Sequence, residues 1–117
     1  MPAHITDLDD ELARCIAACS DCHQACTALV GHCLARGGEH AAPAHINLLL
    51  ACADICRTSA DTMLRRIPQH AATCRACAEI CAACADDCEA MAADDPVMRR
   101  CAEICRACAE HCRAMAA

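Results

Sequence analysis

The chain has 117 residues, a formal net charge of −6 at pH 7 and sixteen Cys, and it lacks Phe, Tyr and Trp entirely. An acidic balance disfavours nucleic acid and anionic membrane surfaces as partners, because both attract basic proteins. Charged residues interrupt the apolar stretches every few positions, so no segment is predicted to span a bilayer.

Helical periodicity and boundary residues predict four helices in a single domain of residues 1–117. The predicted helices cover residues 7–36, 44–67, 69–93 and 96–116. Thr6 or Asp7 can cap the first helix, and Asp94 or Asp95 can cap the fourth. The second helix must end before Pro68. Linkers of a few residues force neighbouring helices to run antiparallel, so the predicted fold is an all-α, up-down-up-down four-helix bundle.

The cysteines recur along the predicted helices at alternating steps of three and four residues, as on the seam of a heptad. This spacing places the cysteines of each helix on one face. The four sets are Cys15, Cys19, Cys22, Cys26 and Cys33; Cys52 and Cys56; Cys74, Cys77, Cys81, Cys84 and Cys88; and Cys101, Cys105, Cys108 and Cys112. The opposite faces carry Arg, Asp and Glu, so the thiols are predicted to point inward and to line the core.

Extended beyond the cysteines, the same seams predict the rest of the interior. They add Leu8, Leu12, Leu29, His45, Leu49, Ser59, Met63, His70, Met91, Met98 and Met115. Methionine on a seam is ordinarily core filler, but Met91 and Met98 flank the last turn, near Cys33 and His45 in this topology. These donors are predicted to form a mouth that admits metal. Met63, His70 and Met115 are weaker candidate ligands at the other end, and His23, His32, His40 and His111 are expected to be largely solvated.

Packing and disulfide formation are the two simpler explanations of so many cysteines. Free Cys packs as a small hydrophobe, but sixteen of them would leave the centre of a bundle underfilled. Residues three or four apart on a helix have Cβ atoms about 5–6 Å apart, whereas a disulfide needs about 3.8 Å. Disulfides between helices remain an alternative, but they do not require this spacing.

Residues 1–7 show no secretory signal, so a reducing cytosol is the expected compartment.

Soft thiolate ligands select Cu(I), zinc or iron–sulfur clusters. Seven Cys-x-x-x-Cys pairs offer such ligands: Cys15–Cys19, Cys22–Cys26, Cys52–Cys56, Cys77–Cys81, Cys84–Cys88, Cys101–Cys105 and Cys108–Cys112. Cu(I) can approach one ion per thiolate through bridging sulfurs, which leaves the filled core nearly neutral. Tetrahedral zinc would leave a large negative charge, although bridged zinc clusters reduce it. Iron–sulfur proteins usually draw their cysteines from loop motifs with tighter spacing.

The four seams in this order resemble the cytosolic branch of the bacterial copper storage proteins over nearly the whole chain. The resemblance is carried by Cys19-Ser20-Asp21-Cys22, Cys52-Ala53-Asp54-Ile55-Cys56, Cys74-Arg75-Ala76-Cys77 and the run from Cys101 to Cys112. It implies a tetramer of four-helix bundles, each holding many Cu(I) ions and admitting metal at one end through ligands other than Cys. The chain departs from the family in having Met91 and Met98 where relatives often have more His, and His45 where relatives can have Cys.

The leading hypothesis is therefore cytosolic storage and detoxification of Cu(I) without catalysis. A copper-donating chaperone is a candidate partner. The alternatives are a zinc or general thiolate metal buffer and an iron–sulfur electron-transfer protein. An enzyme is least expected, because no catalytic constellation stands out and the seams predict buried thiols rather than an exposed reactive one.

Overall fold

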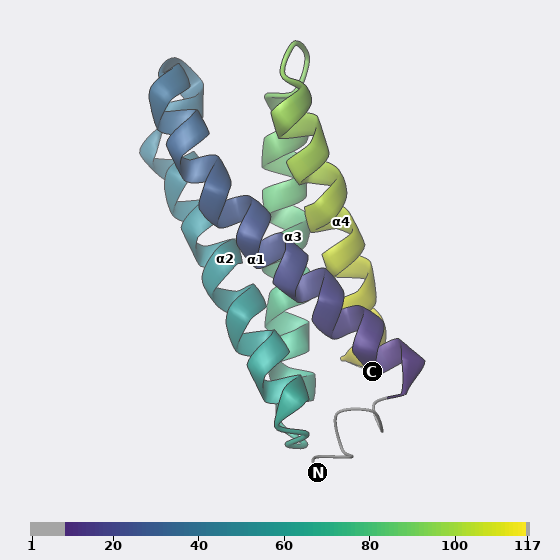
Figure 1. Cartoon of the computed structure of the whole chain (residues 1–117). Coiled ribbons are helices and arrows are strands. Elements are labelled where there is room, and N and C mark those ends of the chain that lie inside the picture. Colours follow the sequence, from purple (N-terminus) through teal and green to yellow (C-terminus); the bar gives the residue numbers. More distant parts are fainter. Residues whose placement is uncertain (1–8, 117) are drawn as a thin grey trace.

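The computed structural model describes residues 9–116. Its elements are α1 (Asp10–Arg36), the 3₁₀ turn η2 (Gly38–Ala41), α2 (Pro43–Leu64), α3 (His70–Ala90) and α4 (Pro96–Met115). Residues 9–116 contain no β-strand, and the four long helices form an elongated bundle (Figure 1). The predicted all-α bundle is confirmed.

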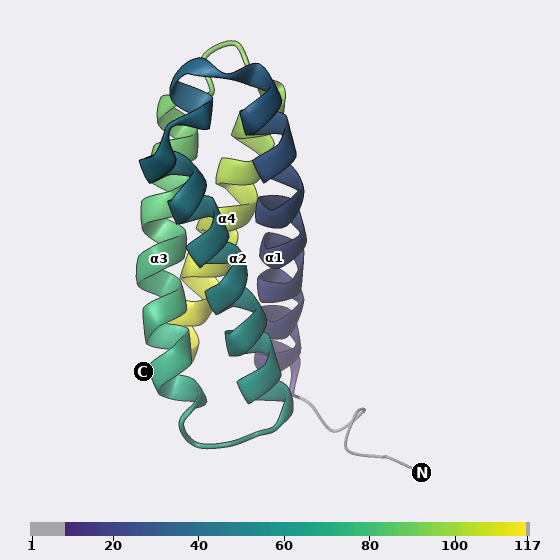
Figure 2. The ribbon, with the colours of Figure 1, turned by 90° about the vertical axis from the view of Figure 1, so that its left-hand side faces the viewer.

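Consecutive helices run in opposite directions around one long axis (Figure 2). α1 packs against α2 and α4, and α3 packs against the same two helices. The bundle measures 49 × 27 × 19 Å, so its interior is a narrow column enclosed by four helices. η2 and the α3–α4 turn lie at one end of this column, here called the mouth end (Figure 2). The α2–α3 turn lies at the other end, here called the far end.

The start of α1 differs from the prediction. The helix begins at Asp10, and the carboxylate of Asp9 caps it by accepting a 2.8 Å hydrogen bond from the Leu12 amide. Asp9 has an extended backbone, which places its side chain over the free amides of the first turn. The predicted caps Thr6 and Asp7, like the predicted core residue Leu8, lie outside the described residues.

The other helix ends fall within three residues of their predicted positions. α1 stops at Gly37, whose φ of 73° lies in the left-handed region that glycine tolerates. α2 ends at Leu64 rather than at residue 67, because Arg66 also adopts a left-handed conformation with φ of 56°. α3 ends at Ala90 rather than at residue 93. Asp95 caps α4, as one of the two predicted candidates.

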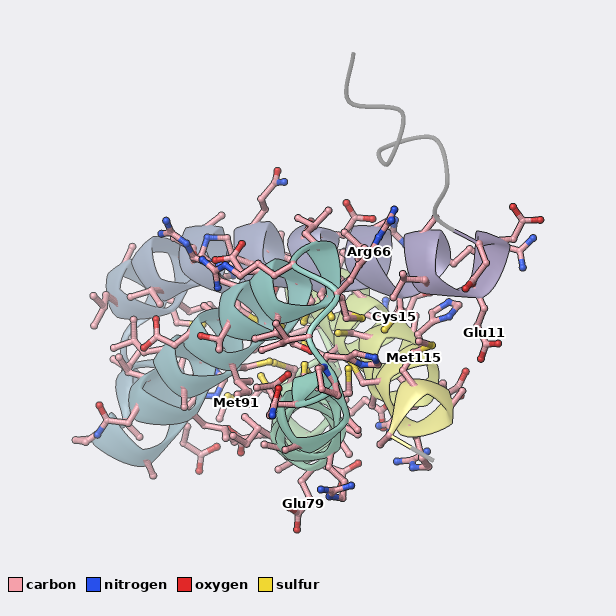
Figure 3. The ribbon with its side chains drawn as sticks, turned by 90° about the horizontal axis from the view of Figure 1, so that it is seen from below. Glu11, Cys15, Arg66, Glu79, Met91 and Met115 are labelled. Carbon is pink, nitrogen blue, oxygen red and sulfur yellow. The ribbon has the colours of Figure 1, made fainter. Side chains whose placement is uncertain are left out.

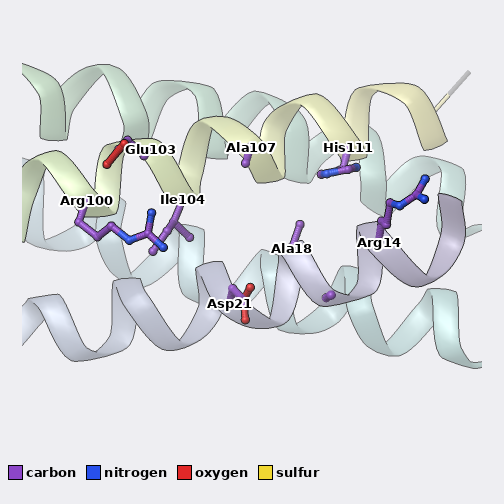
Figure 4. Close-up of a pocket in the computed structure, with 9 residues that line it drawn as sticks. Arg14, Ala18, Asp21, Arg100, Glu103, Ile104, Ala107 and His111 are labelled. Carbon is purple, nitrogen blue, oxygen red and sulfur yellow. The ribbon is translucent and has the colours of Figure 1, made fainter. Parts of the chain in front are cut away.

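Two further observations concern the surroundings of the bundle. None of the helices within residues 9–116 combines the length and apolar character needed to cross a bilayer. An outer groove of about 340 Å³ runs between α1 and α4 and is lined by alanines and by charged side chains such as Arg14 and Asp21 (Figure 4). No cysteine lines this groove, so it is separate from the thiol-lined column.

Candidate metal site

All sixteen cysteines are buried in the column between the helices. Fifteen are at most 1% exposed, and Cys101 is 4% exposed. None of them forms a disulfide. The seams therefore face the interior, as their spacing predicts, and the thiols are free to act as ligands.

Sulfur atoms from different helices touch one another along the column. The Sγ–Sγ distances between contacting thiols range from 3.4 Å, for Cys19 and Cys112, to 4.0 Å, for Cys22 and Cys26. One continuous path of such contacts runs through Cys15, Cys112, Cys19, Cys108, Cys56, Cys81, Cys52, Cys22, Cys105 and Cys84. The core is thus one connected array of sulfur and not a set of separate Cys pairs.

The array divides into overlapping groups whose sulfurs all lie within 4.8 Å of one another. Four groups hold four thiols: Cys19, Cys77, Cys108 and Cys112; Cys22, Cys52, Cys56 and Cys81; Cys22, Cys26, Cys52 and Cys105; and Cys56, Cys77, Cys81 and Cys108. A fifth group holds three: Cys15, Cys74 and Cys112. Because the groups share members, a metal bound in one group would share thiolates with its neighbours.

The sulfur spacing suits a bent bridge by a metal ion. With metal–sulfur bonds of about 2.3 Å, the observed separations of 3.4 to 4.0 Å correspond to S–metal–S angles of about 95–120°. These angles are those of three- or four-coordinate ions. Linear coordination of a single ion would need a wider gap of about 4.6 Å, so the array as it stands favours ions that each contact several sulfurs.

The thiols differ in how readily they ionise. Burial raises the pKa of the Cys33 thiol to about 11, and the nearby charge of Asp95 adds to this shift. In the middle of the array, the pKa of Cys22 is lowered, and its hydrogen bond with Cys105 is the largest cause. The hydrogen bond with Cys101 instead raises the pKa of Cys105. Full ionisation of such an array requires cations to replace the protons.

At the mouth end, three different donor atoms converge. The Sγ of Cys33 lies 3.3 Å from Nε2 of His45 and 3.7 Å from Sδ of Met98. All three residues are at most 2% exposed. The structure therefore brings together three of the predicted mouth residues, here called the mouth cluster. Met91 is partly exposed and packs against the core near the α3–α4 turn, but it makes none of these contacts.

Two carboxylates support the mouth cluster and were not predicted to do so. Asp87 Oδ2 lies 2.6 Å from Nδ1 of His45, which fixes the ring and directs Nε2 toward Cys33. Asp95, 2% exposed, holds the start of α4 through hydrogen bonds from the Val97 and Met98 amides to Oδ1. Sequence identified Asp95 only as a helix cap, and no spacing rule connects Asp87 with a histidine on another helix.

Asp95 also gathers donors from α1 and η2. Its Oδ2 lies 2.9 Å from His32 Nε2, 3.0 Å from Arg36 Nη1 and 3.2 Å from His40 Nε2. The hydrogen bond with His32 is the largest of the interactions that lower the pKa of Asp95 to about 2. The expectation that His32 and His40 are largely solvated is therefore wrong. Both are held by a buried carboxylate that joins the end of α1, η2 and the start of α4.

The far end is built differently. Figure 3 looks onto this end and labels Cys15 of α1 and Met115 of α4, with sulfur atoms gathered between the helices. Met63 is fully buried there, and Met115 is partly buried against the core. Ser59 Oγ lies 3.4 Å from the Cys74 sulfur. His70, the first residue of α3, has a buried Nδ1 atom with no hydrogen-bond partner.

A helical bundle whose interior is an array of free thiols, with a mixed sulfur and nitrogen cluster at one end, defines a metal–thiolate protein. Comparison with known families specifies the class further. A sequence profile of the copper storage proteins matches residues 8–117, so this chain belongs to the copper storage protein family. The resemblance drawn from the cysteine seams is confirmed.

Solved structures of similar proteins agree with this assignment. A structural-genomics protein from Nitrosospira multiformis is 44% identical, with a TM-score of 0.86 over 93% of this chain and 97% of that one. The Cu(I)-bound copper storage protein BsCsp3, from Bacillus subtilis, is 37% identical, with a TM-score of 0.83 over 92% and 100% of the two chains. The copper storage protein Ccsp from Streptomyces lividans, loaded with 10 copper equivalents, is 34% identical, with a TM-score of 0.79 over 92% and 84%.

Proposed function

We propose that this chain stores Cu(I) in its thiol-lined column and thereby limits free copper in the cell. The observation that carries the proposal is the column of sixteen buried, unbridged thiols, most of which form one connected array. Two relatives of the same fold support it, since BsCsp3 is described with Cu(I) bound and Ccsp with 10 copper equivalents. All sixteen cysteines are assigned as ligands.

Charge favours Cu(I) over zinc in this array. Burying ionised thiolates without counter-charge is strongly unfavourable. One monovalent ion per thiolate cancels the charge, whereas four tetrahedral Zn²⁺ ions would cancel only about half of it. Soft thiolate and thioether ligands also prefer Cu(I). Bridged zinc clusters would cancel more of the thiolate charge than four separate zinc ions do. A zinc or general thiolate metal buffer is for this reason the second candidate function.

Copper is proposed to enter at the mouth end. The mouth cluster offers the thiol of Cys33, with an imidazole nitrogen and a thioether sulfur within 3.7 Å of it. Thioether sulfur and neutral imidazole nitrogen bind Cu(I) without releasing a proton, unlike a thiol, which suits transient transfer into the array. Met91, at the C-terminal end of α3, is a further candidate ligand on the same side.

The proposed setting is the cytosol, with a copper-donating chaperone as the source of the metal and a tetramer as the assembled form. Support for the compartment comes from a relative, since the Streptomyces lividans protein is described as a cytosolic copper storage protein. Storage rather than catalysis fits an interior in which every thiol lies beside another potential ligand.

Anaerobic titration of the reduced protein with Cu(I), followed by native mass spectrometry, tests the proposal. We expect loading of the order of one ion per thiol, and saturation at one or two ions would overturn storage. The same protein preloaded with zinc provides the matched comparison. We expect excess Cu(I) to displace the zinc, and retention of zinc under these conditions would favour the metal-buffer alternative.

A further inference from the structure

The far end of the column contains an unexplained polar atom. Among the described side chains that are not exposed, Nδ1 of His70 is the only buried nitrogen or oxygen without a hydrogen-bond partner. Leaving a buried polar group unpaired is unfavourable, and such atoms often mark the place of an ion or a water. His70 lies one helical turn before Cys74 on α3, so the two side chains leave the helix on the same face.

Cys74 belongs to the group of the array that has one thiol fewer than the others. Cys15, Cys74 and Cys112 form a set of three, whereas the other four groups have four thiols each. The seam of α2 explains the difference, because its steps from Cys52 and Cys56 lead to Ser59 where another cysteine would continue the pattern. Ser59 is fully buried, and its hydroxyl lies 3.4 Å from the Cys74 sulfur.

We propose that the far end is a distinct Cu(I) site in which Cys15, Cys74 and Cys112 supply thiolates and His70 Nδ1 supplies the fourth ligand. This inference rests on the proposed copper storage function and deepens it. The imidazole replaces the thiol that Ser59 does not provide, and its nitrogen lone pair gains the partner that it lacks. Copper remains Cu(I) on binding, and the thiol protons that it replaces leave to solvent.

The geometry defines what must move. The three sulfurs lie within 4.8 Å of one another, and His70 stands outside this group. Coordination therefore requires rotation about the His70 side-chain torsions. His70 is the first residue of α3 and is only partly buried, so its side chain is packed on fewer sides than those further along the helix. The Cys15–Cys112 pair, 3.7 Å apart, needs little adjustment.

The test follows ring nitrogens in the full chain labelled with ¹⁵N-histidine, kept reduced and titrated anaerobically with Cu(I). We expect the Nδ1 resonance of His70, assigned by its disappearance in His70→Gln, to shift on loading. His111 is the matched control, because it lies on the same part of α4 as Cys112 but lines the outer groove. Its resonances are expected to stay in place.

Ser59→Cys is the second arm of the test. The variant completes a four-thiol group, so the copper-dependent shift of His70 should disappear while copper is still taken up. A shift that persists in Ser59→Cys, or no His70 shift in a wild-type chain that fills with copper, overturns the far-end site and leaves the storage function intact. Failure to bind copper at all overturns the storage function itself, so the two failures are distinguishable.

Discussion

The two ends of the thiol column are held by different kinds of interaction. At the mouth end, buried or half-buried carboxylates pair with His45, His32 and Arg36. At the far end, α2 and α3 are joined by a hydrogen bond of 2.8 Å between the hydroxyls of Thr62 and Thr73, both neutral. Charge-assisted hydrogen bonds are roughly twice as strong as neutral ones. The mouth cluster is therefore held more firmly than the Thr62–Thr73 contact holds the far end.

The strongest test of this contrast is Asp95→Asn. The substitution removes the charge that His32, Arg36 and His40 share, and we expect the reduced, copper-free protein to lose about 2 kcal/mol of unfolding free energy. Urea denaturation should show a lower midpoint with an unchanged slope. Asp94→Asn is the control, because Asp94 is 81% exposed and pairs with Arg36 at the surface. A loss of similar size in Asp94→Asn would contradict the special role of Asp95.

Acid should weaken the mouth end through the same carboxylate. The pKa of Asp95 is lowered from an ordinary value of 3.8 to about 2 in the folded chain, chiefly by its hydrogen bond with His32. The stabilisation is therefore complete above about pH 4 and is lost as the pH falls through about 2. We expect the stability difference between wild type and Asp95→Asn to shrink over this range. A difference that stays constant from pH 6 to pH 2 would show that ionisation of Asp95 is not its source.

Most features of the thiol array and of the far end could be predicted from the sequence. Fewer contacts of the mouth end could be predicted. Steps of three and four residues are fixed by helix geometry, so the inward face of Cys15 or Cys108 is predictable without knowing the packing partner. The termination of α1 at Gly37 and the capping of α4 by Asp95 are equally local. Contacts such as the one between Asp87 and His45 join residues of different helices that are 42 positions apart in the sequence. They depend on the rotation of each helix about its own axis, which the sequence pattern gives only approximately.

The histidines illustrate the same limit. His32 and His40 lie off the seams, so a pattern of polar and apolar positions places them in solvent. A buried carboxylate at the start of α4 changes their environment, because Asp95 needs donors once it is removed from water. The orphaned Nδ1 of His70 is a property of packing alone and leaves no trace in residue spacing.

Asp87→Ala tests whether the mouth cluster depends on the orientation of His45. Loss of a residue that orients a metal ligand typically lowers metal affinity or activity by 10–100-fold. We expect Cu(I) uptake from a competing chelator to slow by about tenfold, with the final number of bound ions unchanged. Asp86→Ala is the control, since Asp86 is 74% exposed and pairs with Arg106. Equal effects of the two variants would argue against a positioning role for Asp87.

The smallest effect is expected at the far end, from Thr62→Val. The variant keeps the shape of the side chain but removes the hydroxyl, whose one proton lies within reach of both the Ser59 carbonyl and the Thr73 oxygen. Thr73 still donates to the His70 carbonyl, so no donor is stranded, and the loss should be about 1 kcal/mol in urea denaturation. Thr58→Val, at an exposed position of α2, is the control for β-branching and should change stability by less. Suppose instead that Thr62→Val destabilised the chain more than Asp95→Asn does. The far end of the column would then be more rigid than the mouth end. The rotation that brings His70 to the three thiols would in that case be harder to achieve.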